Sequence, residues 1–174
     1  MKELPYVKLR AMEPEDLDML YRIENDEALW ALGATNVPYS RFVLHEFMSS
    51  NTGDIYTDKQ VRLMIEDEHG QVVGMADLMR FDPKNLRAEV GLIICKPYRR
   101  RGFARATIEK LHDYALHTLH LHQVYAVIAV RNEATRTLFR EYGYVQSASL
   151  KEWLYDGQTY QDAVVLQHSL NNEQ

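Results

Sequence analysis

Residues 96–108, KPYRRRGFARATI, place four arginines around one glycine and then run into apolar positions at helical spacing. Arg99, Arg100, Arg101 and Arg105 are suited to contact the phosphates of a nucleic acid. A second interpretation is a pyrophosphate cradle, because the backbone at Gly102 is open to a ligand and the first amides of a helix have no acceptor within it. A third interpretation is an ordinary strand-to-helix turn with solvated arginines.

The overall charge of the chain counts against the first interpretation. The 174 residues carry a formal net charge of −5. Affinity for nucleic acid comes mostly from many contacts between basic side chains and phosphates, and an acidic chain is a poor general binder of such backbones. We therefore expect no nucleic-acid partner, and a cationic partner such as an amine or a basic peptide suits the chain better.

Length, hydropathy and cysteine use indicate the class of protein. The chain has 46% apolar residues and is long enough for one ordinary domain with a substantial core. No apolar run approaches the roughly 20 residues of a membrane helix, and the first residues lack the apolar stretch of a signal peptide. We therefore predict a cytoplasmic protein without a membrane partner. The single Cys95 excludes an internal disulfide framework, and we interpret it as a small buried residue.

The elements that position the glycine turn follow from periodicity and turn signals. Strands are expected at 6–12, 60–67, 71–81, 87–95, 123–130, about 145–154 and 159–169, and helices at 13–25, 38–50, 102–119 and 132–144. The order β-αα-βββ-α-β-α-ββ predicts one α/β (α+β) domain over residues 1–174, with a mixed, mostly antiparallel sheet. Strand 87–95 is nearly continuously apolar after Glu89, which predicts burial on both faces. Phe42 and Phe47 are expected on the apolar side of the second helix.

Two motifs carry a family resemblance. RRRGFA, residues 99–104, fits the pattern Arg/Gln-x-x-Gly-x-Gly/Ala, and about thirty residues later NEATRTLFREYGY begins with Asn132. In this order and on these elements, the motifs resemble the GNAT superfamily of acetyl-CoA-dependent N-acyltransferases. The resemblance extends over nearly the whole chain. It is greatest to bacterial spermidine N-acetyltransferases and to ribosomal-protein N-terminal acetyltransferases.

The resemblance implies where acetyl-CoA would bind. The backbone of Leu92, Ile93 and Ile94 would pair with the pantetheine arm as an added strand, in a slot where strand 87–95 diverges from strand 123–130. Asn132 would contact the cofactor, although a plain helix N-cap is an equally good interpretation. No metal is implied. The pyrophosphate would be held by the backbone amides of Arg99, Arg100, Arg101, Gly102, Phe103, Ala104 and Arg105.

The implied reaction is direct attack of a neutral amine on the thioester, which needs a base for the ammonium proton. Glu89, at the start of a buried strand, is the candidate catalytic base, because desolvation raises the pKa of a carboxyl group. The alternative interpretation of Glu89 is a salt bridge to Arg87 or a helix contact. The family's usual general acid is a Tyr seven positions after Asn132, where this chain has Phe139. Tyr142 is a partial substitute or a packing residue.

The function expected from the resemblance is N-acetyl transfer to a primary amine. The acceptor is a polyamine, another small amine or a peptide N-terminus. Because Phe139 cannot donate a proton, the alternative is an acyl-CoA-binding protein with little transferase activity. The acidic pair with which spermidine acetyltransferases bind polyamine is replaced by Asn36–Val37. C-terminal strands in this fold often pair between subunits, so a homo-oligomer is one expected state, although the sequence itself does not reveal the oligomer.

Overall fold

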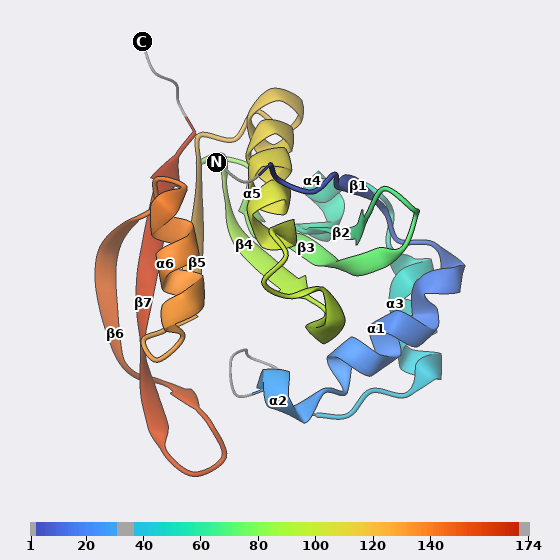
Figure 1. Ribbon diagram of the computed structural model, residues 1–174, viewed down its shortest axis with the longest axis horizontal. Helices are drawn as coiled ribbons and strands as arrows, with labels where there is room; N and C mark the ends of the chain where they lie inside the picture. The colour runs from blue at the N-terminus through green and yellow to red at the C-terminus, as the bar shows by residue number, and fades with distance from the viewer. Residues whose placement is uncertain (1–2, 31–36, 171–174) are drawn as a thin grey trace. The chain divides into compact units, whose positions relative to one another are not determined.

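The computed structural model describes residues 3–30 and 37–170 (Figure 1). Asn36 and most of the predicted loop 30–38 lie outside these residues. The strands are β1 (Lys8–Ala11), β2 (Val61–Glu66), β3 (Val72–Asp82), β4 (Arg87–Ile94), β5 (Gln123–Ala129), β6 (Val145–Tyr155) and β7 (Tyr160–Ser169). The α-helices are α1 (Leu17–Glu24), α2 (Glu27–Trp30), α3 (Arg41–Ser50), α4 (Ile55–Asp58), α5 (Phe103–Asp113) and α6 (Glu133–Glu141). Two 3-10 turns, Pro14–Asp16 and Lys96–Tyr98, precede α1 and α5, and a π-helical turn, Tyr114–Thr118, follows α5.

The predicted order of elements is confirmed, with two short helices, α2 and α4, in addition. The strand order in the sheet is β1-β2-β3-β4-β5-β7-β6. Neighbours from β1 to β4 pair antiparallel, whereas β4 and β5 run parallel. The predicted fold class, α/β with a mixed and mostly antiparallel sheet, is therefore confirmed.

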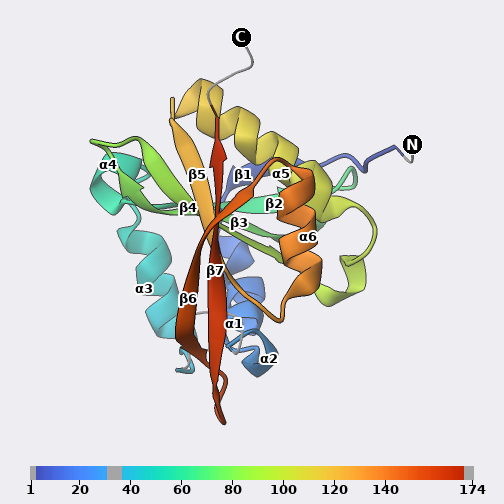
Figure 2. The same cartoon turned by 90° about the vertical axis from the view of Figure 1, so that its left-hand side faces the viewer.

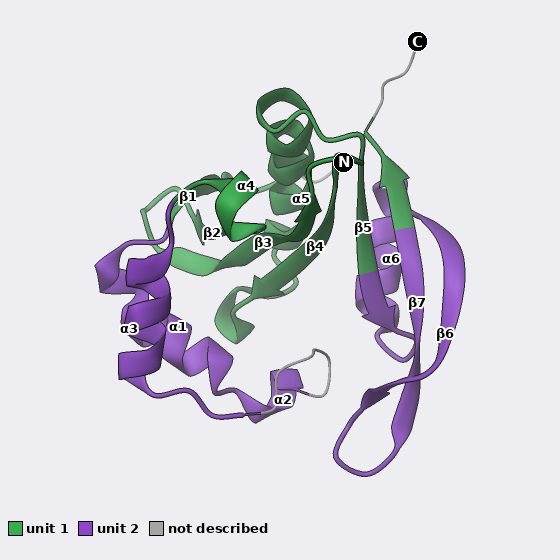
Figure 3. Ribbon diagram, turned by 180° about the vertical axis from the view of Figure 1, so that it is seen from behind, with its two compact units in different colours: residues 1–11, 53–126, 167–174 green, residues 12–52, 127–166 purple. Residues whose placement is uncertain are grey.

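The chain forms two compact units, and each combines segments that are far apart in the sequence (Figure 3). Unit 1 contains residues 1–11, 53–126 and 167–174, and unit 2 contains residues 12–52 and 127–166. The expectation that residues 1–174 form one domain stays a prediction.

Unit 1 is built on the β2–β3 hairpin and on β4. The central part of the hairpin is covered on both faces, because the neighbouring residues Met64 and Ile65 are both almost completely buried, as is Met75. Helix α5 packs against β3 and β4 through Ile108 and Leu111. Gly74 of β3 lies so close to β4 that any larger side chain there would collide with the backbone carbonyl of Ile93.

Burial along β4 differs from the prediction. Ala88 and Val90 are buried, but every residue from Gly91 to Ile94 is only half-buried. The predicted burial on both faces of this strand is therefore wrong, and so is the buried position predicted for Cys95, which is half-buried. The apolar residues at 91–95 are not completely buried, because this part of the sheet is incompletely covered.

Unit 2 contains the first helices and the closing hairpin. Ser40 caps α3 by accepting a hydrogen bond from the Val43 amide at 3.1 Å. The core residue of α3 is Leu44, whereas Phe42 is 68% exposed, so Phe42 does not lie on the apolar side as predicted. Figure 2 shows β6 and β7 side by side as a long hairpin, whose turn is held by amide hydrogen bonds to the Asp156 carboxylate.

No helix in the described part of the chain is long and apolar enough to cross a membrane.

Candidate active site

The glycine turn joins β4 to α5 with the geometry that a phosphate cradle needs. Gly102 has φ +90°, in the left-handed region, and it is the N-cap of α5. The first backbone hydrogen bond of the helix runs from the Ala106 amide to the Gly102 carbonyl at 3.1 Å. The amides of Phe103 and Ala104 come before that bond and so have no acceptor in the helix, which leaves them available to an anion.

The arginines around this turn have different surroundings. The Arg99 Nε donates a hydrogen bond to the Ile94 carbonyl at 2.9 Å and so ties the turn to the end of β4. The Arg101 guanidinium lies 5.7 Å from the ring centres of Tyr98 and Phe103. Arg100 is exposed and has φ +60°, and Arg105 is exposed on the first turn of α5. The turn is therefore an ordered structure and not only a run of solvated arginines.

One backbone edge of β4 is open over most of its length. On the β3 side, β4 is paired from Glu89 to Ile94. On the β5 side, the ladder contains only three pairs and ends at Glu89 and Tyr125. Among the described residues, Leu92, Ile93 and Ile94 have no strand partner on that side, and their side chains are half-buried. The predicted separation of these two strands is confirmed.

Glu89 lies at the point where the β4–β5 ladder ends. Its side chain is only 12% exposed, and its Oε2 lies 3.1 Å from Arg80 Nη1. The geometry of this contact is poor for a hydrogen bond, and Oε2 accepts none from the described residues. Burial raises the pKa of the Glu89 carboxyl, and the Arg80 charge partly offsets this effect. A buried carboxylate with a raised pKa is suited to accept a proton from an amine.

The structure places two residues beside Glu89 that the sequence did not indicate. Arg80 lies in a bulge of β3, and Tyr125 lies opposite Glu89 in β5. Burial raises the pKa of Tyr125, and the negative charge of Glu89 raises it further. The salt bridge considered for Glu89 involves Arg80 and not Arg87, which pairs with Asp82 at 3.1 Å. No local pattern indicates these contacts, because they depend on the register between strands.

In unit 2, Asn132 and Phe139 both have structural contacts. The Asn132 Oδ1 accepts a hydrogen bond from the Thr135 amide at 3.3 Å, as an N-cap does. Phe139 is 2% exposed, and its ring meets the Tyr144 ring edge to face at 4.7 Å between centres. Phe139 is therefore a packing residue. Tyr142 is half-buried at the C-terminal end of α6.

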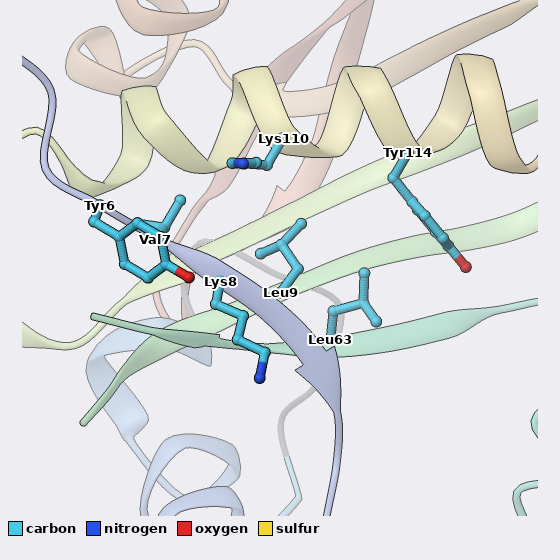
Figure 4. Close-up of a pocket in the computed structure, with 7 residues that line it drawn as sticks. All are labelled: Tyr6, Val7, Lys8, Leu9, Leu63, Lys110 and Tyr114. Carbon is cyan, nitrogen blue, oxygen red and sulfur yellow. The ribbon is translucent and has the colours of Figure 1, made fainter. Parts of the chain in front are cut away.

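A stacked histidine pair and a pocket between β1, β2 and α5 contain none of the predicted site residues. His112 stacks on His168 with 4.7 Å between ring centres, and in the described residues no three His, Cys, Asp or Glu side chains gather as metal ligands. A pocket of about 300 Å³ opens between β1, β2 and α5 (Figure 4). It is lined by Tyr6, Val7, Lys8, Leu9, Leu63, Lys110 and Tyr114, and it contains none of the predicted site residues.

The chain is similar to known acetyltransferases in sequence and in structure. Spermidine N(1)-acetyltransferase of Vibrio cholerae serotype O1 is 29% identical over 155 residues, which are 88% of this chain and 87% of that protein. The crystal structure of spermidine N-acetyltransferase from Vibrio cholerae in complex with CoA and spermine has a TM-score of 0.87 and 26% identity, and the match covers 94% of this chain and 95% of that one. A dodecameric structure of spermidine N-acetyltransferase from the same organism has a TM-score of 0.81 and 27% identity, with 94% of both chains covered.

The sequence profile of one family covers most of the chain. The acetyltransferase (GNAT) domain matches residues 7–145, which include the glycine turn, β4, β5 and α6. The chain therefore belongs to the acetyltransferase (GNAT) domain family, and its reaction is the transfer of an acetyl group from acetyl-CoA to an amine.

Proposed function

We propose that the acceptor of this acetyltransferase is an aliphatic polyamine. The observation that carries the proposal is the buried Glu89 carboxylate at the end of the β4–β5 ladder, directly beside the open edge of β4. A carboxylate in this position attracts an ammonium group and can accept its proton. The acidic chain and the resemblance to spermidine acetyltransferases support the same acceptor class.

We assign the role of general base to Glu89. The reacting amine must be neutral, and the ammonium of an alkyl amine has an unperturbed pKa near ~10. Burial moves the pKa of Glu89 upward, so the carboxylate is a better proton acceptor than an exposed glutamate. The Glu89 side chain is 12% exposed, so bulk water has limited access to the carboxylate.

The residues of the open edge and of the cradle fit acetyl-CoA, which would supply the activated acetyl group as a thioester. The backbone of Leu92, Ile93 and Ile94 has no strand partner on the β5 side, where an extended ligand can pair, although the Ile94 carbonyl already accepts a hydrogen bond from Arg99. The amides that follow Gly102 face outward at the positive end of α5, where a pyrophosphate is stabilised. The amides assigned to it run from Arg99 to Arg105, and of these the Arg99 amide already donates a hydrogen bond to the Lys96 carbonyl at 3.3 Å. We keep Asn132 as a further candidate contact beside its N-cap role.

No side-chain acid is assigned. The Phe139 ring has no proton to donate and packs on Tyr144. We propose that water supplies the proton in its place, since a coenzyme A thiolate is a fair leaving group.

We also propose that the protein is a homo-oligomer. Strand β6 is the last strand in the sheet order, and nine of its eleven residues are exposed. An open edge of this length is a template for pairing with another chain. The dodecameric structure of the related acetyltransferase supports assembly of this kind. A cytoplasmic location stays a prediction from the sequence.

The acceptor is tested by following release of free thiol from acetyl-CoA. The purified protein is offered spermidine, spermine, amino acids, aminoglycosides and short peptides with free N-termini. We expect release with spermidine and spermine and little release with the peptides. A peptide that outperforms every polyamine would instead indicate a protein acceptor.

Two further outcomes of the assay separate the alternatives. Binding of acetyl-CoA with no acceptor-dependent thiol release from any compound would favour the acyl-CoA-binding protein. Failure to bind coenzyme A would contradict both functions. Glu89→Gln tests the base, with Glu68→Gln as its control, because Glu68 is an exposed glutamate in the β2–β3 turn.

A further inference from the structure

Arg80 has an unusual backbone conformation in β3. Its φ is +50°, in the left-handed region that residues other than glycine rarely adopt. The register of β3 against β4 shifts between Met79 and Asp82, so Arg80 and Phe81 form a bulge. Bulges re-aim side chains and are frequent beside active sites. We therefore looked to the contacts of the Arg80 side chain to explain this backbone conformation.

The bulge is anchored by the next residue. Phe81 is 4% exposed, its ring meets the Tyr56 ring edge to face at 5.1 Å, and its amide donates a hydrogen bond to the Lys59 carbonyl at 2.9 Å. These contacts hold Phe81 in the core, so Arg80 is turned away from it. The Arg80 guanidinium then lies beside the Glu89 carboxylate.

The two partners of this ion pair differ greatly in exposure. The Glu89 side chain is 12% exposed, whereas the Arg80 side chain is 67% exposed. The contact is 3.1 Å long, but Oε2 accepts no hydrogen bond of acceptable geometry from the described residues. An exposed cation without a directional bond is weakly held, so another cation can displace it.

The ion pair of Arg62 and Asp77 in the same sheet is a useful comparison, because it has the geometry of a stable structural pair. The Arg62 guanidinium binds the Asp77 carboxylate through two hydrogen bonds, of 2.7 and 3.0 Å, and both side chains are largely covered. In the Arg80–Glu89 pair Oε2 accepts no hydrogen bond from the described residues, and Arg80 is largely exposed although Glu89 is covered. The comparison indicates that the contact of Arg80 with Glu89 is exchangeable and not a fixed part of the core.

We propose that Arg80 is the resident counter-ion of Glu89 and that the ammonium group of the acceptor takes its place beside the carboxylate. Arg80 is then a specificity-determining residue: an amine that is cationic in solution competes for the position, whereas a neutral or anionic acceptor does not. This inference rests on the proposed function, in which Glu89 accepts the proton of the amine.

The same contact sets the pH range in which Glu89 acts. Arg80 lowers the pKa that burial raises, so the carboxylate is ionised at a lower pH than it would be alone. Tyr125 of β5 also interacts with Glu89, and the charges of Arg87 and Asp82 act on Tyr125. Removal of Arg80 therefore shifts the acidic limb of the activity profile to higher pH, because Glu89 must be deprotonated to act.

The test compares Arg80→Met with Arg80→Lys and with a control, Arg87→Met. Arg87, the first residue of β4, is an arginine in the same sheet, but it pairs with Asp82. In Arg80→Met we expect the acidic limb of the pH profile of kcat/KM to move to higher pH by roughly half a unit to one unit. The KM for spermidine should fall about two- to fivefold, and the KM for acetyl-CoA should stay unchanged. Arg80→Lys should restore the wild-type limb, and Arg87→Met should leave limb and KM as in the wild type.

A binding measurement without turnover separates this inference from the proposed function. Spermidine is titrated calorimetrically into wild type and Arg80→Met in the presence of coenzyme A, which has no acetyl group to transfer. Tighter binding by Arg80→Met supports the inference, and equal or weaker binding by the variant overturns it. If wild type shows no spermidine-dependent thiol release, the proposed function fails, and the calorimetric result still decides the role of Arg80.

Discussion

At the scale of single residues, substitutions at Gly102 and Phe139 are expected to have the clearest effects. Gly102 combines a left-handed φ of +90° with a position where a methyl group would lie 2.9 Å from Pro5 Cδ. The proline ring is rigid and cannot move aside easily. Any side chain at this position therefore disturbs both the turn and the segment that covers it.

We expect Gly102→Ala to raise the KM for acetyl-CoA on the order of tenfold, which corresponds to about 1.4 kcal/mol of lost binding. The matched control is Gly70→Ala, since Gly70 has a similar φ of +75° and no atom within 4 Å of the added methyl group. The control should lose about 1 kcal/mol of stability to backbone strain and keep its KM. Steady-state kinetics and urea unfolding of both variants decide the matter, and an unchanged KM in Gly102→Ala would exclude the turn from cofactor binding.

Phe139→Tyr tests whether the family's usual acid can be restored. The new hydroxyl would enter a site that is 2% exposed and packed on Tyr144, where an unpaired polar group costs about 1–3 kcal/mol. We therefore expect lower stability in urea and no increase in kcat. Phe139→Leu, which removes the ring without adding a hydroxyl, is the control for packing. A higher kcat with a new basic limb in the pH profile of the tyrosine variant would contradict this expectation.

At the scale of elements, α5 and the end of β7 meet at a half-buried pair of histidines. His112 of α5 stacks on His168 of β7. Burial, and secondarily the charge of His168, lower the pKa of His112 from 6.5 to about 4. The folded state therefore binds fewer protons than the unfolded state between these values, and stability is lost as the pH falls from about 6.5 toward 4.

The loss should reach roughly 2 kcal/mol at pH 4.5, after allowance for the partial exposure of the ring. His112→Phe keeps a ring for stacking but cannot be protonated, so its unfolding free energy should fall less between pH 7.5 and 4.5. Urea unfolding at several pH values measures the difference. The control is His117→Gln at an exposed histidine that follows the same helix. Equal pH dependence in wild type and His112→Phe would show that this pair does not govern acid stability.

At the scale of the whole molecule, β6 leaves an edge that a lone chain would not cover. Val145, Trp153 and Tyr155 on this strand are each more than half exposed. Large apolar side chains on an open strand mark an interaction surface. The wild type should therefore have a mass in solution that is a multiple of the 20.3 kDa chain.

We expect the double variant Trp153→Lys, Tyr155→Lys to shift the protein toward smaller species, because like charges along an edge oppose pairing. Tyr6→Lys, at a comparably exposed tyrosine before β1, is the control and should keep the wild-type mass. Size-exclusion chromatography with light scattering measures each mass. A monomeric wild type would contradict the assembly.

Much of the fold was predictable because its signals are local. Apolar spacing and turn signals depend on neighbours in the chain, and the predicted order of elements is confirmed. Burial was less predictable. Phe42 is exposed and Cys95 is half-buried, because covering a side chain depends on elements that lie far away in the sequence.

The sequence by itself determined the family and the position of the glycine turn, since the motif at residues 99–104 is contiguous and its backbone conformation follows from glycine itself. The tertiary structure decided what surrounds Glu89. The register of β3 and β5 against β4 brings Arg80 and Tyr125 to that carboxylate, and register depends on pairing between strands that no local pattern specifies. The pairing of β4 with β5 ends after three residue pairs and so leaves the rest of that edge of β4 open.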